Sequence, residues 1–213
     1  MMPGPTLIKK CYKCNGFFKQ GTLASGNTFD AKWWPDGKMD APMLPETPAL
    51  INCPSCNEYL WLSKTKEVDV FRPFDDYDNT HLKYLKVSFF NRPNIDSFML
   101  VLKEKNLTKN KEAYVRVKLM HFFNDVNRDM EEPISEPSNI QLENYDRLLI
   151  LASKDNANDT ILRAEIYREL GEFDKSLNLL DKVKSEDFIK SANHLKRLCF
   201  EKDSRVMQIY DKD

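Results

Sequence analysis

The spacing of apolar residues changes partway along the chain. In the C-terminal part, Val115, Leu119, Phe122 and Val126 recur at positions i, i+4, i+7 and i+11, which lie on one face of a helix. The N-terminal part has short apolar segments broken by glycine and proline, which is typical of strands and turns. The pattern therefore predicts an α+β protein, in which a small N-terminal β domain precedes an all-α domain. Helices are expected over residues 94–105, 110–128, 142–153, 157–170, 174–183 and 187–210, the last with a kink near residue 203.

Composition places the boundary between the two parts. Residues 1–75 contain all three tryptophans, five of the six glycines and eight of the eleven prolines, whereas residues 95–213 contain a single glycine. We therefore predict an N-terminal domain over 1–75, a linker with a short helix around 82–89 within 76–94, and a helical domain over 95–213.

Turn-forming residues subdivide the first domain. Pro35, Asp36 and Gly37 predict the turn of a hairpin, because proline presets φ and glycine adopts conformations that other residues avoid. The three prolines in 42–48 predict an extended surface strap after this hairpin.

Four cysteines form two C-x-x-C pairs, Cys11 with Cys14 and Cys53 with Cys56. Together they offer four soft sulfur ligands, the tetrahedral set that Zn²⁺ prefers and that also accepts iron, but not Mg²⁺ or Ca²⁺. The 38 residues between the pairs exceed the spacing of short zinc motifs, and the predicted hairpin accounts for the excess because its ends return together. Four protein ligands leave no position for a substrate, so we expect one structural ion that contributes folding energy.

An asparagine follows the second cysteine of each pair. Asn15 and Asn57 belong to the few non-glycine residues that tolerate positive φ, which lets backbone N–H groups turn towards sulfur. This repeated feature strengthens the prediction of a metal site.

Residues 8–64, with these two pairs, resemble the zinc-ribbon family. The resemblance implies a structural metal held by Cys11, Cys14, Cys53 and Cys56, with the two metal-binding turns, called knuckles, at the tips of β-hairpins. The pairs also resemble the knuckles of rubredoxin, which implies an alternative: redox-active iron in an electron carrier.

Residues 160–183 resemble one tetratricopeptide repeat. Ala164 stands where the paired helix approaches closely, Gly171 ends the first helix, and Ser176 occupies the small position of the second. Phe173 and Leu177 are expected to pack back against the first helix. The resemblance implies that neighbouring helices stack with this pair and bind a protein, and the alternative is a compact helical bundle.

Other side chains are further functional candidates. The adjacent Trp33 and Trp34 should point to opposite sides of a strand. We interpret both as packing residues, one in the metal-binding domain and the other under the strap or the helical domain, and the alternative is an exposed platform for a partner or for unstacked bases. Trp61 is expected to pack. Four lysines near the first knuckle form either a phosphate-contacting patch or a solvated rim: Lys9, Lys10, Lys13 and Lys19.

The remaining candidates predict no catalysis. His81, His121 and His194 are scattered, and we interpret them as polar or partly buried residues, while Cys199 lies on an apolar helix face as a core thiol. The chain has no phosphate-binding glycine loop and no G-x-S-x-G or H-E-x-x-H motif. A non-enzymatic protein is therefore expected.

Charge and hydropathy bear on the partner. Thirty-two Lys and Arg against 33 Asp and Glu give a formal net charge of −1, which offers no compositional case for nucleic acid or membrane. The N-terminus lacks a secretory pattern, and the longest apolar stretches are too short to span a bilayer. We expect a cytoplasmic protein with reduced thiols and an unidentified protein partner, and keep a nucleic-acid-binding zinc ribbon as a further alternative.

Overall fold

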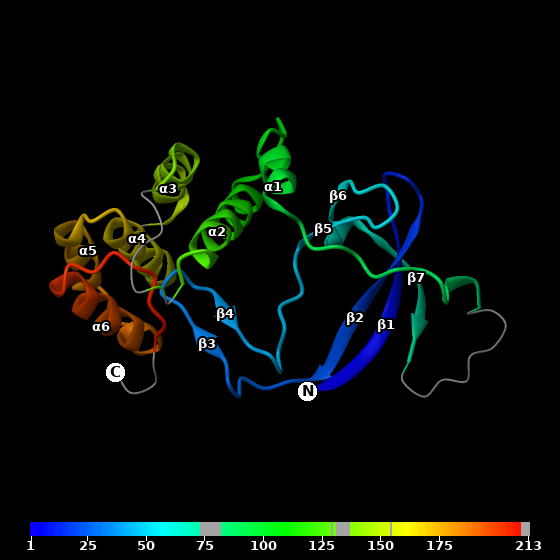
Figure 1. Cartoon of the computed structure of the whole chain (residues 1–213), viewed down its shortest axis with the longest axis horizontal. Helices are drawn as coiled ribbons and strands as arrows, with labels where there is room; N and C mark the ends of the chain where they lie inside the picture. Colours follow the sequence, from blue (N-terminus) through cyan, green and yellow to red (C-terminus); the bar gives the residue numbers. More distant parts are fainter. Residues whose placement is uncertain (73–81, 129, 131–136, 154, 210–213) are drawn as a thin grey trace. The chain divides into compact units, whose positions relative to one another are not determined.

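The computed structural model describes residues 1–72, 82–128, 130, 137–153 and 155–209. Strands precede helices in this part of the chain, so the α+β class is confirmed (Figure 1). The strands are β1 (Met2–Lys10), β2 (Phe17–Ser25), β3 (Lys32–Trp33), β4 (Met39–Asp40), β5 (Leu50–Asn52), β6 (Tyr59–Trp61) and β7 (Lys66–Phe71). The α-helices are α1 (Ile95–Leu102), α2 (Lys109–Asp125), α3 (Asn139–Leu151), α4 (Ala157–Glu169), α5 (Phe173–Leu180) and α6 (Glu186–Phe200), with 3₁₀ turns at Leu62–Lys64 and Leu82–Tyr84.

The chain forms two compact units that a single cut in the sequence does not separate. The N-terminal unit comprises Met1–Ala31 and Ala41–Lys103, and the helical unit comprises Lys32–Asp40 and Glu104–Asp213. Residues 32–40 thus belong to the helical unit, although they precede most of the N-terminal unit in the sequence, and residues 95–103 belong to the N-terminal unit.

Two small sheets build the N-terminal unit. Antiparallel strands in the order β2-β1-β7 form one sheet, and β5 pairs with β6 in the other. Buried Phe18 of the first sheet packs with Ile51 and Leu60 of the second. Asn52 donates its side-chain amide to the hydroxyl of Ser97 over 2.9 Å, which ties α1 to β5.

The predicted hairpin is confirmed, and it lies in the helical unit. Strands β3 and β4 pair antiparallel, Gly37 has φ 82°, and its N–H donates to the carbonyl of Trp34 over 3.0 Å. The strap over 42–48 has no helix or strand, as expected.

Among the described residues, apolar cores join helices α2 to α6. The first contains Met120 of α2, Tyr145 and Leu148 of α3, and Ile166 of α4. The second joins α4, α5 and α6 and includes Cys199, which confirms the prediction of a core thiol.

The turn between α4 and α5 follows the sequence prediction. Gly171 has φ 73°, and buried Ser176 donates its hydroxyl to the carbonyl of Ala164 over 2.8 Å. The small residues therefore allow the close approach of these two helices, and Phe173 and Leu177 pack against the same core.

The apolar face predicted for the second helix is confirmed in its first half and wrong in its second half. Val115 and Leu119 are buried, but Phe122 and Val126 are exposed. The last turns of α2 instead bury polar residues, because the hairpin places a carboxylate there. The last helix also ends earlier than predicted, at Phe200, and a positive φ at Lys202 follows it.

Several predictions lie outside the described residues. They concern the first part of the predicted linker (76–81, including His81), residues 131–136 between the second and third predicted helices, and the end of the last predicted helix at residue 210.

Candidate metal centre

Two similar knuckles carry the four cysteines, one between β1 and β2 and the other between β5 and β6. In the first, the N–H of Cys11 donates to the carbonyl of Gly16 over 2.8 Å and the N–H of Asn15 returns to the carbonyl of Cys11 over 3.0 Å. In the second, the N–H of Asn57 donates to the carbonyl of Cys53 over 2.8 Å. Asn15 and Asn57 have φ of 63° and 56°, as predicted.

The knuckles bring the four cysteine sulfurs together although 38 residues lie between the pairs. All four Sγ atoms lie within 4.8 Å of one another, and none of the cysteines is in a disulfide. Cys14 Sγ and Cys53 Sγ are 3.8 Å apart. Zinc–sulfur bonds of about 2.3 Å in a tetrahedron separate the sulfurs by about 3.8 Å. The cluster could therefore hold one metal ion with little rearrangement.

Backbone N–H groups point at the sulfurs of the first knuckle. Lys13 and Cys14 donate to Cys11 Sγ over 3.3 and 3.4 Å, and Gly16 donates to Cys14 Sγ over 3.4 Å. The Gly16 N–H lowers the pKa of the Cys14 thiol, whereas burial raises the pKa of Cys11 and, to about 12, that of Cys56. A coordinating cation reverses the effect of burial, because a metal-bound thiol deprotonates.

Side chains of each knuckle also hold the opposite one. Lys13 of the first forms an ion pair with Glu58 at 2.8 Å and lies 3.9 Å from the ring centre of Tyr59. Tyr12 accepts a hydrogen bond at its hydroxyl from the N–H of Trp61 over 3.1 Å. These contacts add to the cysteine cluster in joining the two knuckles. Apart from the position of these residues beside the cysteines, no sequence signal predicts them.

Gly16 lies where the two knuckles approach each other closely. A Cβ atom there would lie 2.9 Å from Ser55 Oγ and 3.3 Å from Cys14 Sγ. A side chain at this position would therefore require Ser55 to move.

The remaining candidates are distributed over the molecule. Trp34 is buried and Trp33 is 47% exposed, so the predicted opposition of the pair is confirmed, while a role for Trp33 in binding stays a prediction. Trp61 is buried, as expected, and so are His121 and His194.

The four lysines do not act as one free patch. Lys13 is paired with Glu58, and Lys19 donates from Nζ to the carbonyl of Leu85 over 2.9 Å. Two of the four cations are therefore already bound to groups of the protein.

No protein-family model, no curated protein and no solved structure matches the chain. Among the described residues, every helix is too short or too polar to cross a bilayer.

Proposed function

We propose that the protein holds one structural zinc ion through Cys11, Cys14, Cys53 and Cys56. The single observation that carries this proposal is the convergence of four Sγ atoms within 4.8 Å. Four thiolates complete a tetrahedral shell, so the ion has no open position for a substrate and serves to stabilise the fold. In small zinc domains such a site contributes on the order of 10 kcal/mol.

Elemental analysis of the untagged full chain, produced with both zinc and iron in the medium, tests the site. We expect one zinc per chain in the wild type, loss of stoichiometric metal in Cys53→Ser, and full retention in Cys199→Ser. Cys199 is the matched control, because it is a buried thiol outside the cluster. A coloured protein with one redox-active iron would favour the electron carrier, and a metal-free wild type would overturn the proposal.

We further propose that the helical unit docks a protein partner and that the protein is not an enzyme. Helices α2 to α6 pack in sequence, and the α4–α5 pair resembles a tetratricopeptide repeat. Large apolar side chains project from the helices into solvent, among them Ile150 and Phe200. In the proposed complex these side chains would be the apolar anchors that contact the partner.

Affinity capture with the full chain tests this second part. A partner of the helical unit should be captured by the wild type and by Phe29→Ser, and lost with Phe200→Ser. The comparison is matched, because both phenylalanines are 74% exposed and Phe29 belongs to the N-terminal unit. Capture that nuclease treatment abolishes would favour the nucleic-acid alternative. Turnover of a substrate, with no captured partner, would contradict the proposal.

A further inference from the structure

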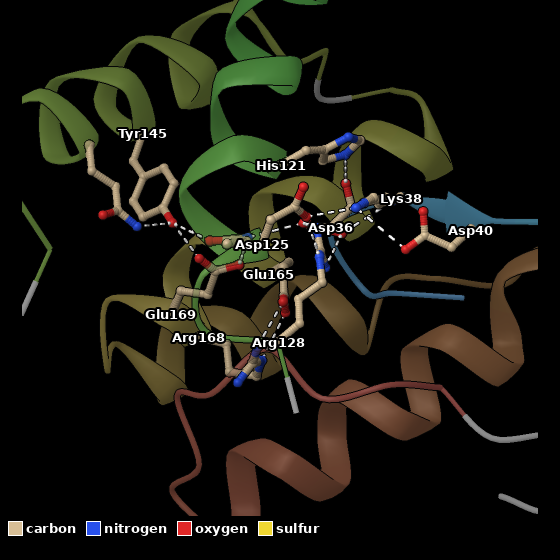
Figure 2. A network of polar contacts seen from close by, with 12 residues as sticks. Asp36, Lys38, Asp40, His121, Asp125, Arg128, Tyr145, Glu165, Arg168 and Glu169 are labelled. Atoms are coloured by element: carbon tan, nitrogen blue, oxygen red, sulfur yellow. Dashed lines mark hydrogen bonds and ion pairs between the residues drawn. The ribbon is translucent and has the colours of Figure 1, made fainter. Parts of the chain in front are cut away.

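The β3–β4 hairpin is anchored in the helical unit by one buried carboxylate. Asp36, at the turn, accepts hydrogen bonds from Arg128 at 2.7 and 3.3 Å and from the side-chain amide of Asn124 at 3.0 Å. Its backbone carbonyl lies 3.1 Å from Nε2 of His121. The Arg128 guanidinium also lies 4.7 Å from the ring centre of buried Trp34. The hairpin tip is therefore held by ionic and hydrogen-bonding contacts (Figure 2) and also by the contact between Arg128 and Trp34.

The charge of this carboxylate is compensated within the helical unit. Burial acts to raise the pKa of Asp36, but the charges of His121 and Arg128 and the hydrogen bonds outweigh it and hold the pKa below its ordinary value. Removing one partner of such a buried pair is far more costly than removing an exposed one. Asp36 is thus the main electrostatic anchor of the hairpin.

The anchor extends through the core of the unit (Figure 2). The side-chain amide of Asn124 on α2 donates to Asp36 and, over 3.0 Å, to Glu169 on α4. Glu169 in turn contacts the hydroxyl of Tyr145 on α3. Docking of the hairpin therefore completes a hydrogen-bonded network that connects three helices.

Along the chain, one end of the hairpin leads back to the first knuckle and the other end leads on to the second knuckle. Upstream, residues 26–31 join it to β2, which begins after the first knuckle; downstream, residues 41–49 join it to β5, which ends before the second. The strands β2 and β5 belong to different sheets. The hairpin is thus the tip of a long loop, and the four cysteines lie at the base where the loop closes.

We propose that metal binding at the cysteine cluster is coupled to docking of the β3–β4 hairpin in the helical unit, so that each strengthens the other. This inference rests on the structural zinc proposed above. The segments 26–31 and 41–49 are the tethers of the hairpin. An ion that holds the two knuckles together restricts both tethers, which lowers the conformational entropy lost when Asp36 docks. Loss of the ion frees the tethers and favours release of the hairpin. Because coupling is reciprocal, docking must strengthen metal binding by the same factor.

A competition titration against a zinc chelator tests the coupling in the full chain. We expect Asp36→Asn to weaken zinc binding about tenfold, and Asp40→Asn to change it less than twofold. Asp40 is the control, because it is an exposed acid of the same hairpin and its ion pair with Lys38 is 3.4 Å long. Far-UV circular dichroism shows whether the helices of Asp36→Asn remain folded.

The reverse measurement needs no variant. Stripping zinc from the reduced wild type should speed amide hydrogen exchange of residues 32–40 at least tenfold, while peptides of α5 and α6 change little. Equal zinc affinity in Asp36→Asn and the wild type, or unchanged exchange of 32–40, would overturn the coupling. A wild type that binds no zinc would instead refute the proposed metal site, so the two failures are distinguishable.

Discussion

At the scale of single residues, backbone conformation and charge decide what each side chain can do. Asn15 and Asn57 occupy the left-handed region, which most residues enter at a cost of about 1–2 kcal/mol. In the helical unit, Glu165 is paired with Arg168 at 2.7 Å and Asp36 with Arg128 at 2.7 Å. Glu169 contacts Tyr145 and Asn124, which are neutral.

The environment of Glu169 predicts a specific dependence of stability on pH. Burial and the neighbouring charge of Glu165 raise the pKa of Glu169 well above 4.5. The folded protein therefore keeps a proton on Glu169 that the unfolded chain releases. The contribution of Glu169 to the free energy of unfolding consequently falls as the pH rises above about 4.5. Glu169→Gln cannot ionise, so we expect it to be more stable than the wild type at pH 7 and to lose this advantage at pH 4.

Denaturant unfolding between pH 4 and 8 measures this effect. Glu143→Gln on α3 is the matched control, because it makes the same change at an exposed position. If the free energy of unfolding of Glu169→Gln depends on pH in the same way as that of the wild type, Glu169 does not hold this proton in the folded protein.

At the scale of elements, the α4–α5 pair depends on how tightly the chain can turn. Gly171 ends α4 at φ 73°, and a Cβ atom at this position would touch nothing within 4 Å. The requirement for glycine is therefore one of backbone conformation alone. Ser176 then places its hydroxyl on a carbonyl of α4, which satisfies a polar group at the closest approach of the two helices.

Substitution of Gly171 tests this explanation. We expect Gly171→Ala to lower the free energy of unfolding by about 1 kcal/mol, since alanine enters the left-handed region at a cost. Gly171→Asn should lose less, because asparagine tolerates this conformation. Chemical denaturation followed by far-UV circular dichroism measures both, and equal stability of Gly171→Ala and the wild type would show that the turn relaxes to another conformation.

At the scale of the whole molecule, the helical unit is discontinuous in sequence. Residues 32–40 leave the N-terminal unit, dock in the helical unit and return. The N–H of Ile209 donates to the carbonyl of Trp33 over 2.8 Å, so the C-terminal segment also holds the hairpin. An excised helical fragment without the hairpin is consequently incomplete.

A fragment spanning 104–213 tests this organisation. This fragment lacks Asp36 and Trp34, so Arg128 loses its buried partners. We expect its free energy of unfolding to be at least about 2 kcal/mol lower than that of a fragment that contains the hairpin. The reference is the same fragment with residues 30–42 fused to it through a flexible linker, which should recover most of this loss. Identical denaturation midpoints for the two fragments would mean that the hairpin adds nothing to the helical unit.

The sequence by itself determined the features that a few neighbouring residues control. The C-x-x-C spacing set each pair of ligands, Asn57 set a positive φ, and Gly171 with Ser176 set a helical turn, because each depends on local backbone geometry. Only the tertiary structure decided where the hairpin docks and why the end of α2 buries polar groups. Asp36 and Arg128 lie 92 positions apart, and no local pattern marks a pair that forms only when distant segments meet in a low-dielectric interior.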